Sequence, residues 1–246
     1  MIEIVQQYWR NFLFTDGYQY TGLVVTLWLL AASIATGFVL ALPLSVARTS
    51  SKRWLSRPIG FYTYVFRGTP LYVQLMLFYS GLYGLHVVQT HALLSDFFRS
   101  AMNCTLLAFA LNECAYMTEI LAGAIRAVPY GEVEAAHAIG MSRYTLYRRV
   151  VMPSAIRRAL PMCGNEVILM LHSTTLAFTA TIPDLMKVTR DVNSATYASF
   201  SAFGIAAVLY ATVAFTLVWG FRKLEERGLS FLKPAATTRQ QRHRSA

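Results

Sequence analysis

Three acidic residues, Glu113, Glu119 and Glu166, lie inside strongly apolar parts of the chain. Inside a bilayer a carboxylate costs roughly 2.5–3.5 kcal/mol on insertion scales, so each one needs a compensating contact or a function. A carboxylate in this position can accept a charge-assisted hydrogen bond from a cationic ligand. It can equally bond to a neighbouring helix as a structural contact, and the residues alone leave both interpretations open.

Four more polar residues are candidates for the same pathway. Tyr116 is three residues before the second acid and can either stack on a guanidinium or imidazole group or simply pack. Thr69 and Gln74 fall on one predicted helical face, and Asn165 precedes the third acid. The hypothesis is that these side chains and the three acids line one polar route.

A cation and a predicted helix break lie next to Thr69. Arg67 is followed by Gly68, Thr69 and Pro70. Proline removes a backbone donor and glycine adds flexibility, so the helix should break here. Arg67 either extends to the nearby membrane surface or lies at an inner gate, and the sequence favours neither.

Motifs for catalysis and metal binding are not found in the sequence. There is no Gly-x4-Gly-Lys-Ser/Thr nucleotide loop, no His-Glu-x-x-His and no Gly-x-Ser-x-Gly. Cys104, Cys114 and Cys163 lack Cys-x-x-Cys spacing and are interpreted as packing residues. His172 has no second ligand at metal-binding spacing. We therefore expect no enzyme activity, no metal site and no cofactor bound by this chain.

The composition indicates the kind of structure that must hold these polar residues in place. Hydrophobic residues make up 55% of the chain and charged ones 14%, whereas soluble domains carry roughly 25% charged residues. No formal charge occurs in the 31 residues between Asp16 and Arg48, or in the 30 between Asp191 and Arg222. At about 1.5 Å per residue, either run exceeds the roughly 30 Å of bilayer hydrocarbon. Such long, unalternated runs favour membrane helices over a β-barrel.

The sequence predicts an all-α integral membrane protein with five transmembrane helices. They cover about residues 21–47, 59–83, 101–125, 159–182 and 199–221. Residues 1–230 are predicted to form a single transmembrane domain, and residues 231–246 a polar tail without fixed structure. The N-terminus lacks a cationic region and an Ala-x-Ala site, so we expect no removable signal peptide.

The positive charges orient this predicted bundle. Seventeen Lys and Arg residues fall on one side, four fall on the other, and Arg67 lies within a span. The positive-inside rule then places the C-terminus in the cytoplasm and the N-terminus in the periplasm. Only an odd number of spans gives this split. The net charge of +10 is explained by topology and by attraction to anionic lipid, so no nucleic-acid partner is expected.

The segment 129–153 is a long basic loop on the predicted cytoplasmic side. It exceeds the usual length of a simple connection between helices. The sequence predicts two short helices, with a turn at Gly140 and with Ser142 as the N-cap of the second. The loop either docks a soluble protein or lies on the inner leaflet as an amphipathic helix.

This loop resembles the coupling loop of the membrane subunits of ABC importers. Glu134-Ala135-Ala136, three residues, Gly140, nine residues and Val150-Val151-Met152-Pro153 keep the spacing of that motif in full. In that family the loop inserts into a groove on a separate ATPase subunit. The resemblance implies the coupling residues Glu134, Ala135, Ala136, Gly140, Ser142, Arg143 and Pro153.

Further blocks along nearly the whole chain resemble the polar amino-acid uptake subfamily. They are Thr21-Gly22-Leu23, Ala41-Leu42-Pro43-Leu44, Phe66-Arg67-Gly68-Thr69-Pro70-Leu71, Ala115-Tyr116 with Glu119-Ile120, and Gly164-Asn165-Glu166. The resemblance implies a multi-pass permease subunit of the bacterial inner membrane, forming a heterodimer with a homologous permease. It also implies two cytoplasmic ATPase subunits that use ATP and Mg, and a periplasmic amino-acid-binding protein.

Two departures from the subfamily pattern bear on the substrate. Relatives usually have Arg where this chain has Ala122, and often have Lys where it has His172. The loss of two cations leaves a net-negative cavity, which favours import of Arg, Lys, ornithine or His. The alternatives are an importer of another polar amino acid, such as glutamine, or a membrane anchor without a transport path.

Overall fold

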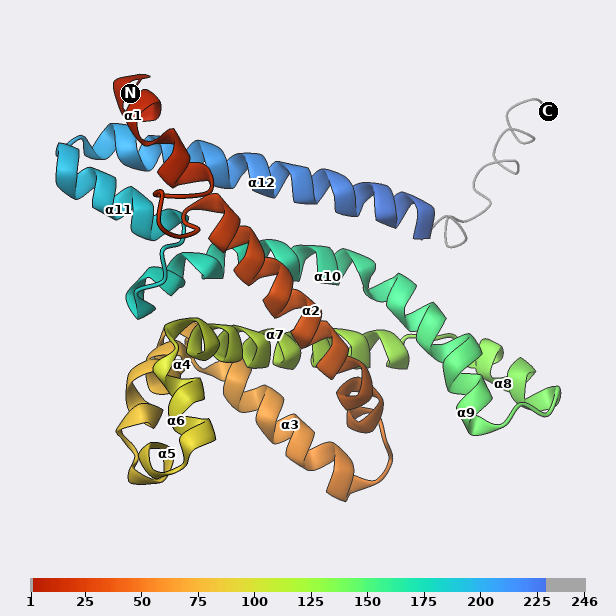
Figure 1. The fold of residues 1–246 in the computed structure, drawn as a ribbon. Coiled ribbons are helices and arrows are strands. Elements are labelled where there is room, and N and C mark those ends of the chain that lie inside the picture. Colours follow the sequence, from red (N-terminus) through yellow and green to blue (C-terminus); the bar gives the residue numbers. More distant parts are fainter. Residues whose placement is uncertain (1, 229–246) are drawn as a thin grey trace, which may run out of the picture.

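The computed structural model describes residues 2–228, which fold into helices and connecting turns (Figure 1). The predicted tail, residues 231–246, lies outside the described residues. The α-helices are α1 (Ile2–Leu13), α2 (Leu23–Arg48), α3 (Arg53–Gly68), α4 (Leu71–Met76), α5 (His86–Thr90), α6 (Ala92–Arg99), α7 (Ala101–Arg126), α8 (Tyr130–Ala138), α9 (Arg143–Leu146), α10 (Met152–Thr174), α11 (Leu185–Thr196) and α12 (Ser199–Gly228).

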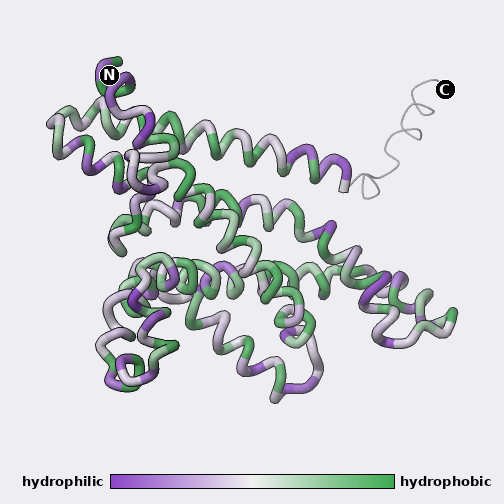
Figure 2. Tube along the Cα trace, viewed as in Figure 1, coloured by the Kyte–Doolittle hydropathy of each residue, from purple (hydrophilic) through white to green (hydrophobic). Residues whose placement is uncertain are grey.

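Three helices, α2, α7 and α12, are long and apolar enough to cross a bilayer. They have 26, 26 and 30 residues, and at about 1.5 Å per residue each exceeds the hydrocarbon thickness. They coincide with the first, third and fifth predicted spans, although α12 continues seven residues beyond the predicted end at 221. In Figure 2 α2 and α12 are mostly apolar along their middle, and polar residues gather towards the C-terminal end of α12. Helix α7 has polar residues in its middle, among them Asn112 and Glu113.

The second predicted span, 59–83, is not one continuous helix. Helix α3 ends at Gly68, Thr69 is extended, and α4 begins at Leu71. A residue before proline is disfavoured in the helical region, so Pro70 stops α3, and the predicted break is confirmed. A five-residue π-helix, Leu77–Gly81, follows α4.

The fourth predicted span, 159–182, is displaced along the chain. Helix α10 begins earlier, at Met152, and the α-helix ends at Thr174. A 3₁₀-helix, Thr175–Ala180, completes the segment, and Thr181 then turns the chain with φ 65°. The sequence missed this change because the Thr-rich segment is apolar enough to extend a helical pattern.

Helix α7 forms the centre of the molecule and packs against α2, α3 and α10. Its buried residues include the small side chains of Ala108, Ala115 and Ala122, which allow helices to approach closely. In contrast, α12 buries only Ala202 and Ala206, so most of its apolar surface is left for lipid or another subunit.

The two ends of the bundle differ. Figure 1 shows α8 and α9 projecting from one end, beside the C-terminal ends of α2, α7 and α12, with α1 and α11 at the other end. At that second end Asp184 is fully buried and caps α11 by accepting from the backbone N–H groups of Met186 and Lys187. Thr26 of α2 accepts from the N–H of Leu185, which fastens α11 to α2.

Replacing Gly37 with alanine should destabilise the contact between α2 and α7. A Cβ at this position would lie 2.7 Å from Cγ of Glu113 and 3.0 Å from the backbone N of Cys114. Overpacking of this kind costs about 1–3 kcal/mol, which a denaturant titration of the detergent-solubilised protein would detect. Gly220→Ala in α12 is the matched control, because a Cβ there meets no atom within 4 Å. Equal stability of the two variants would contradict the prediction.

Candidate functional site

A cavity of about 580 Å³ lies where the break between α3 and α4 faces α7 and α10. We call it the Glu166 cavity. Its lining comes from the break (Arg67, Gly68, Thr69, Pro70, Leu71), from α7 (Asn112, Tyr116), from α10 (Glu166, Leu169, Met170, His172, Ser173) and from the 3₁₀-helix (Thr175, Leu176).

Side-chain amides fix the wall of this cavity at the break. In a continuous helix the carbonyl of Phe66 would accept from residue 70, but proline has no N–H. Gln74 Nε2 and Asn112 Nδ2 donate to that carbonyl instead, at 2.7 and 3.0 Å. Gln74 also donates to Thr69 Oγ1 at 2.7 Å. Gln74 therefore holds the break in place through hydrogen bonds but does not line the cavity, whereas Thr69 and Asn112 line it.

The Glu166 cavity contains one carboxylate and one guanidinium. Glu166 is 8% exposed and makes no ion pair with any of residues 2–228. The guanidinium of Arg67 lies 5.2 Å from the ring centroid of Tyr116, and the Tyr116 hydroxyl donates to the Arg67 carbonyl at 3.4 Å. Arg67 likewise forms no ion pair within the described part of the chain. Both charges are therefore available to a ligand.

The other two acids of the predicted pathway lie elsewhere. Oε1 of Glu119 accepts from Arg48 Nε and from Thr63 Oγ1, both at 2.7 Å. Glu119 lines a second cavity of about 480 Å³, which we call the Glu119 cavity. Glu113 is 1% exposed and lies against Gly37, and neither of its oxygens has a hydrogen-bond partner among the residues described.

The structure therefore brings together only part of the predicted pathway. Glu166, Tyr116 and Thr69 share the Glu166 cavity, whereas Glu119, Glu113, Gln74 and Asn165 do not line it. Sequence reasoning missed Asn112, which lies one helical turn before Tyr116 on the same face of α7. The four-residue spacing from Tyr116 could have identified Asn112 as a candidate from the sequence. No sequence spacing could have predicted that Arg48 pairs with Glu119, because the two residues are 71 positions apart.

Helices α8 and α9 form a projecting hairpin, residues 130–151, that contains most of the predicted coupling residues. Gly140 turns the chain between them with φ 76°, a conformation that glycine adopts without a Cβ penalty. Ser142 Oγ accepts from the N–H of Thr145 and caps α9, as predicted. Pro153 directly follows the π-helix Tyr147–Val151, at the second residue of α10, and its missing N–H removes one donor from this continuous helical segment.

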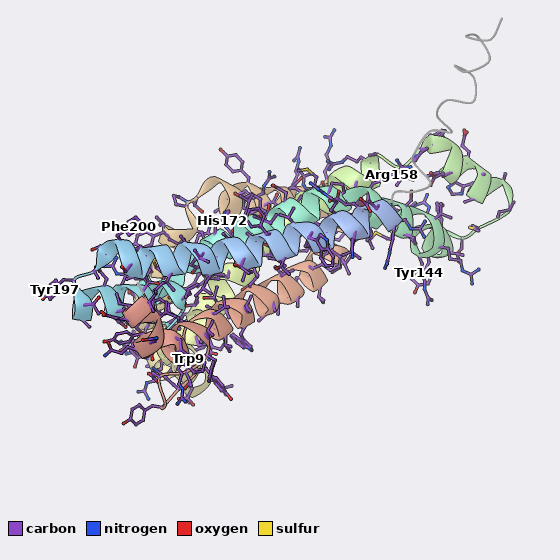
Figure 3. The ribbon with its side chains drawn as sticks, turned by 90° about the horizontal axis from the view of Figure 1, so that it is seen from above. Trp9, Tyr144, Arg158, His172, Tyr197 and Phe200 are labelled. Carbon is purple, nitrogen blue, oxygen red and sulfur yellow. The ribbon has the colours of Figure 1, made fainter. Side chains whose placement is uncertain are left out.

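One face of this hairpin is anchored and the other is free. Ala136 and Leu146 are buried in the same cluster as residues of α7 and α10. Arg158 of α10 reaches Glu132 of α8 at 3.4 Å. The exposed face presents Ile139, 73% exposed, and Tyr144, which Figure 3 shows near this end of the molecule. Exposed apolar side chains on an anchored projection form a surface suited to a protein partner.

Residues 33–230 match the family described as "Binding-protein-dependent transport system inner membrane component". The chain belongs to this family. Its members are inner-membrane components, so the apolar helices α2, α7 and α12 are membrane helices.

Relatives within the family are similar over nearly their whole length. The chain is 57% identical over 237 residues to the histidine/lysine/arginine/ornithine transport system permease protein of Escherichia coli strain K12, covering 96% of this chain and all of that one. It is 59% identical over 229 residues to the protein of the same name from Salmonella typhimurium strain LT2, with 93% and 97% covered.

A solved structure supports the same fold. It is titled "Crystal structure of an amino acid ABC transporter with histidines" and is 30% identical, with a TM-score of 0.76, covering 91% of this chain and 96% of that one.

The Arg48–Glu119 pair should stabilise this permease rather than bind a ligand. Arg48→Gln and Glu119→Gln should each lower the free energy of unfolding, and the double variant should lose less than the sum of the two. The expected coupling is about 0.5–3 kcal/mol, measured by denaturant titration of the four proteins in detergent. Strict additivity would show that the pair contributes nothing.

Proposed function

We propose that this permease imports cationic amino acids and histidine as one half of a heterodimeric pathway driven by a separate ATPase. The observation that carries the proposal is Glu166, a carboxylate without an ion pair that lines the largest described cavity of the chain. The curated relatives named for histidine, lysine, arginine and ornithine transport support the substrate class.

The substrate binds in the Glu166 cavity through its cationic side chain. A charge-assisted hydrogen bond to a partly desolvated carboxylate is among the stronger polar contacts in proteins. The hydroxyls of Thr69, Ser173 and Thr175 and the amide of Asn112 line the same cavity and supply partners for the amino-acid backbone groups. The cavity is open on one side, which a homologous permease subunit closes.

The chain spans the membrane five times, with its N-terminus in the periplasm. Support comes from the arrangement in Figure 1, where the α2–α3 connection, the α8–α9 hairpin and the end of α12 share one end of the bundle. These segments hold the basic clusters, so the positive-inside rule places that end in the cytoplasm. The broken segment α3–α4 and helix α10 with its 3₁₀ extension supply the two spans besides α2, α7 and α12.

Transport is coupled to ATP hydrolysis through the α8–α9 hairpin. The chain contains no nucleotide-binding loop, so the ATPase is a separate protein, present in two copies beneath the two permeases. Closure of the ATPases moves the hairpins together and opens the bundle outward. A periplasmic binding protein then delivers the amino acid, and ATP hydrolysis returns the cavity to the cytoplasmic side.

Glu166→Gln should lower ATP-driven arginine uptake about 10–100-fold, because a hydrogen bond to a charged group contributes roughly 1.5–3 kcal/mol. Uptake is measured in proteoliposomes containing both permeases, the ATPase and the binding protein. Glu113→Gln is the matched control, because it makes the same substitution at a buried carboxyl group that does not line the cavity. Unchanged uptake by Glu166→Gln at equal reconstitution would remove Glu166 from the site.

Ile139→Asp should weaken binding of the ATPase subunits about tenfold or more, because it places a charge at the centre of an apolar contact. Copurification of the ATPase with the permeases measures this loss. Val87→Asp in α5 is the control, since Val87 is also an exposed aliphatic residue and lies at the opposite end of the bundle. Equal recovery of the ATPase with both variants would contradict docking at the hairpin.

A further inference from the structure

Arg67 lies on the wall between the two cavities. It lines the Glu166 cavity and also the Glu119 cavity. The Glu119 cavity is nearer the α8–α9 hairpin, because it is lined by Ala127 at the end of α7 and by Arg158 near the start of α10. Arg67 is therefore the residue that the linings of the two cavities share.

The guanidinium of Arg67 is held loosely. It lies 5.2 Å from the ring centroid of Tyr116, and the Tyr116 hydroxyl donates to the Arg67 backbone carbonyl, not to the guanidinium. It shares one cavity with the carboxylate of Glu166 and the other with that of Glu119, but it pairs with neither. Arg67 is also the penultimate residue of α3, directly before the break. The side chain is therefore placed to swing between the two acids.

Glu119 has room for a second cation. Arg48 and Thr63 both donate to Oε1. Oε2 accepts no hydrogen bond from residues 2–228, and it is not enclosed, in contrast to the carboxylate oxygens of Glu113. An arginine can share a carboxylate with another donor through its planar fork of N–H groups.

We propose that the Arg67 guanidinium and the cationic side chain of the substrate exchange places between the two cavities. In the empty permease Arg67 lines the same cavity as Glu166 without pairing with it, and it competes with an arriving cation for that carboxylate. The cation binds there, and repulsion between like charges in a site of low polarity moves Arg67 to Oε2 of Glu119, where it closes the route to the hairpin. Release of the substrate requires Arg67 to return.

This exchange rests on the proposed function and adds a selection rule to it. A neutral amino acid cannot repel Arg67 from Glu166, so it neither gains the carboxylate nor closes the inner route behind itself. Arg67 is thus a specificity-determining and positioning residue, acting as an internal competitor of the substrate.

The test measures equilibrium binding of radiolabelled arginine to the complete complex of both permeases and the ATPase in detergent, without the binding protein. Removing an internal competitor raises apparent affinity, so Arg67→Gln should bind arginine about tenfold more tightly than the parent. The gain should vanish in Arg67→Gln/Glu166→Gln. Arg67→Lys, which keeps the charge, should bind like the parent. A merely structural role would not produce this pattern.

A second measurement uses proteoliposomes loaded with arginine and lacking ATP. Arg67→Gln should release arginine at least about threefold faster than the parent, because the inner route no longer closes. Unchanged binding and unchanged leak would overturn the proposal. So would failure of both Arg67→Gln and Arg67→Met to assemble with the ATPase, since a guanidinium without an ion pair is not needed to hold the fold. Absence of ATP-driven arginine uptake by the parent complex would instead overturn the proposed function.

Discussion

A carboxylate within an apolar helical bundle has to be matched, buried neutral, or left for a ligand, and this permease shows a different arrangement at each of its three acids. Glu119 is matched by Arg48 and Thr63. Glu113 is enclosed beside Gly37 without a partner among the described residues. Glu166 faces a cavity. The cost of desolvating a charge therefore separates the two acids held within the protein from Glu166, the acid that faces a cavity.

The break between α3 and α4 forms one wall of the cavity that Glu166 faces. Pro70 leaves the carbonyl of Phe66 without its helical donor, and the amides of Gln74 and Asn112 replace it. Non-helical backbone within a membrane is tolerated only where it is satisfied by protein or lines a polar cavity. Here both conditions hold, because the same segment is bonded on one side and open to the Glu166 cavity on the other.

Much of the fold could be predicted from the sequence. Helices α2 and α7 begin and end within two residues of their predicted spans, because long uncharged or weakly charged apolar runs leave little freedom in lipid. The turn at Gly140, the Ser142 cap and the break before Pro70 also follow from local chemistry. The site was less predictable. Asn112 and Glu119 both lie on α7, yet which one faces the cavity depends on how α3 and α10 pack against it, and Arg48 is 71 residues from its partner.

Helix α10 connects the α8–α9 hairpin to the Glu166 cavity as one uninterrupted helix. It starts beside the α8–α9 hairpin and continues past Glu166 to Thr174. Pro153 and Glu166 are therefore separated by about 20 Å of one helix, at roughly 1.5 Å per residue. Between them is Pro161, which removes one backbone hydrogen bond from that helix. No loop interrupts the helix between the hairpin and Glu166, so any displacement of one end is carried to the other along α10, with Pro161 and Gly164 as its points of flexure.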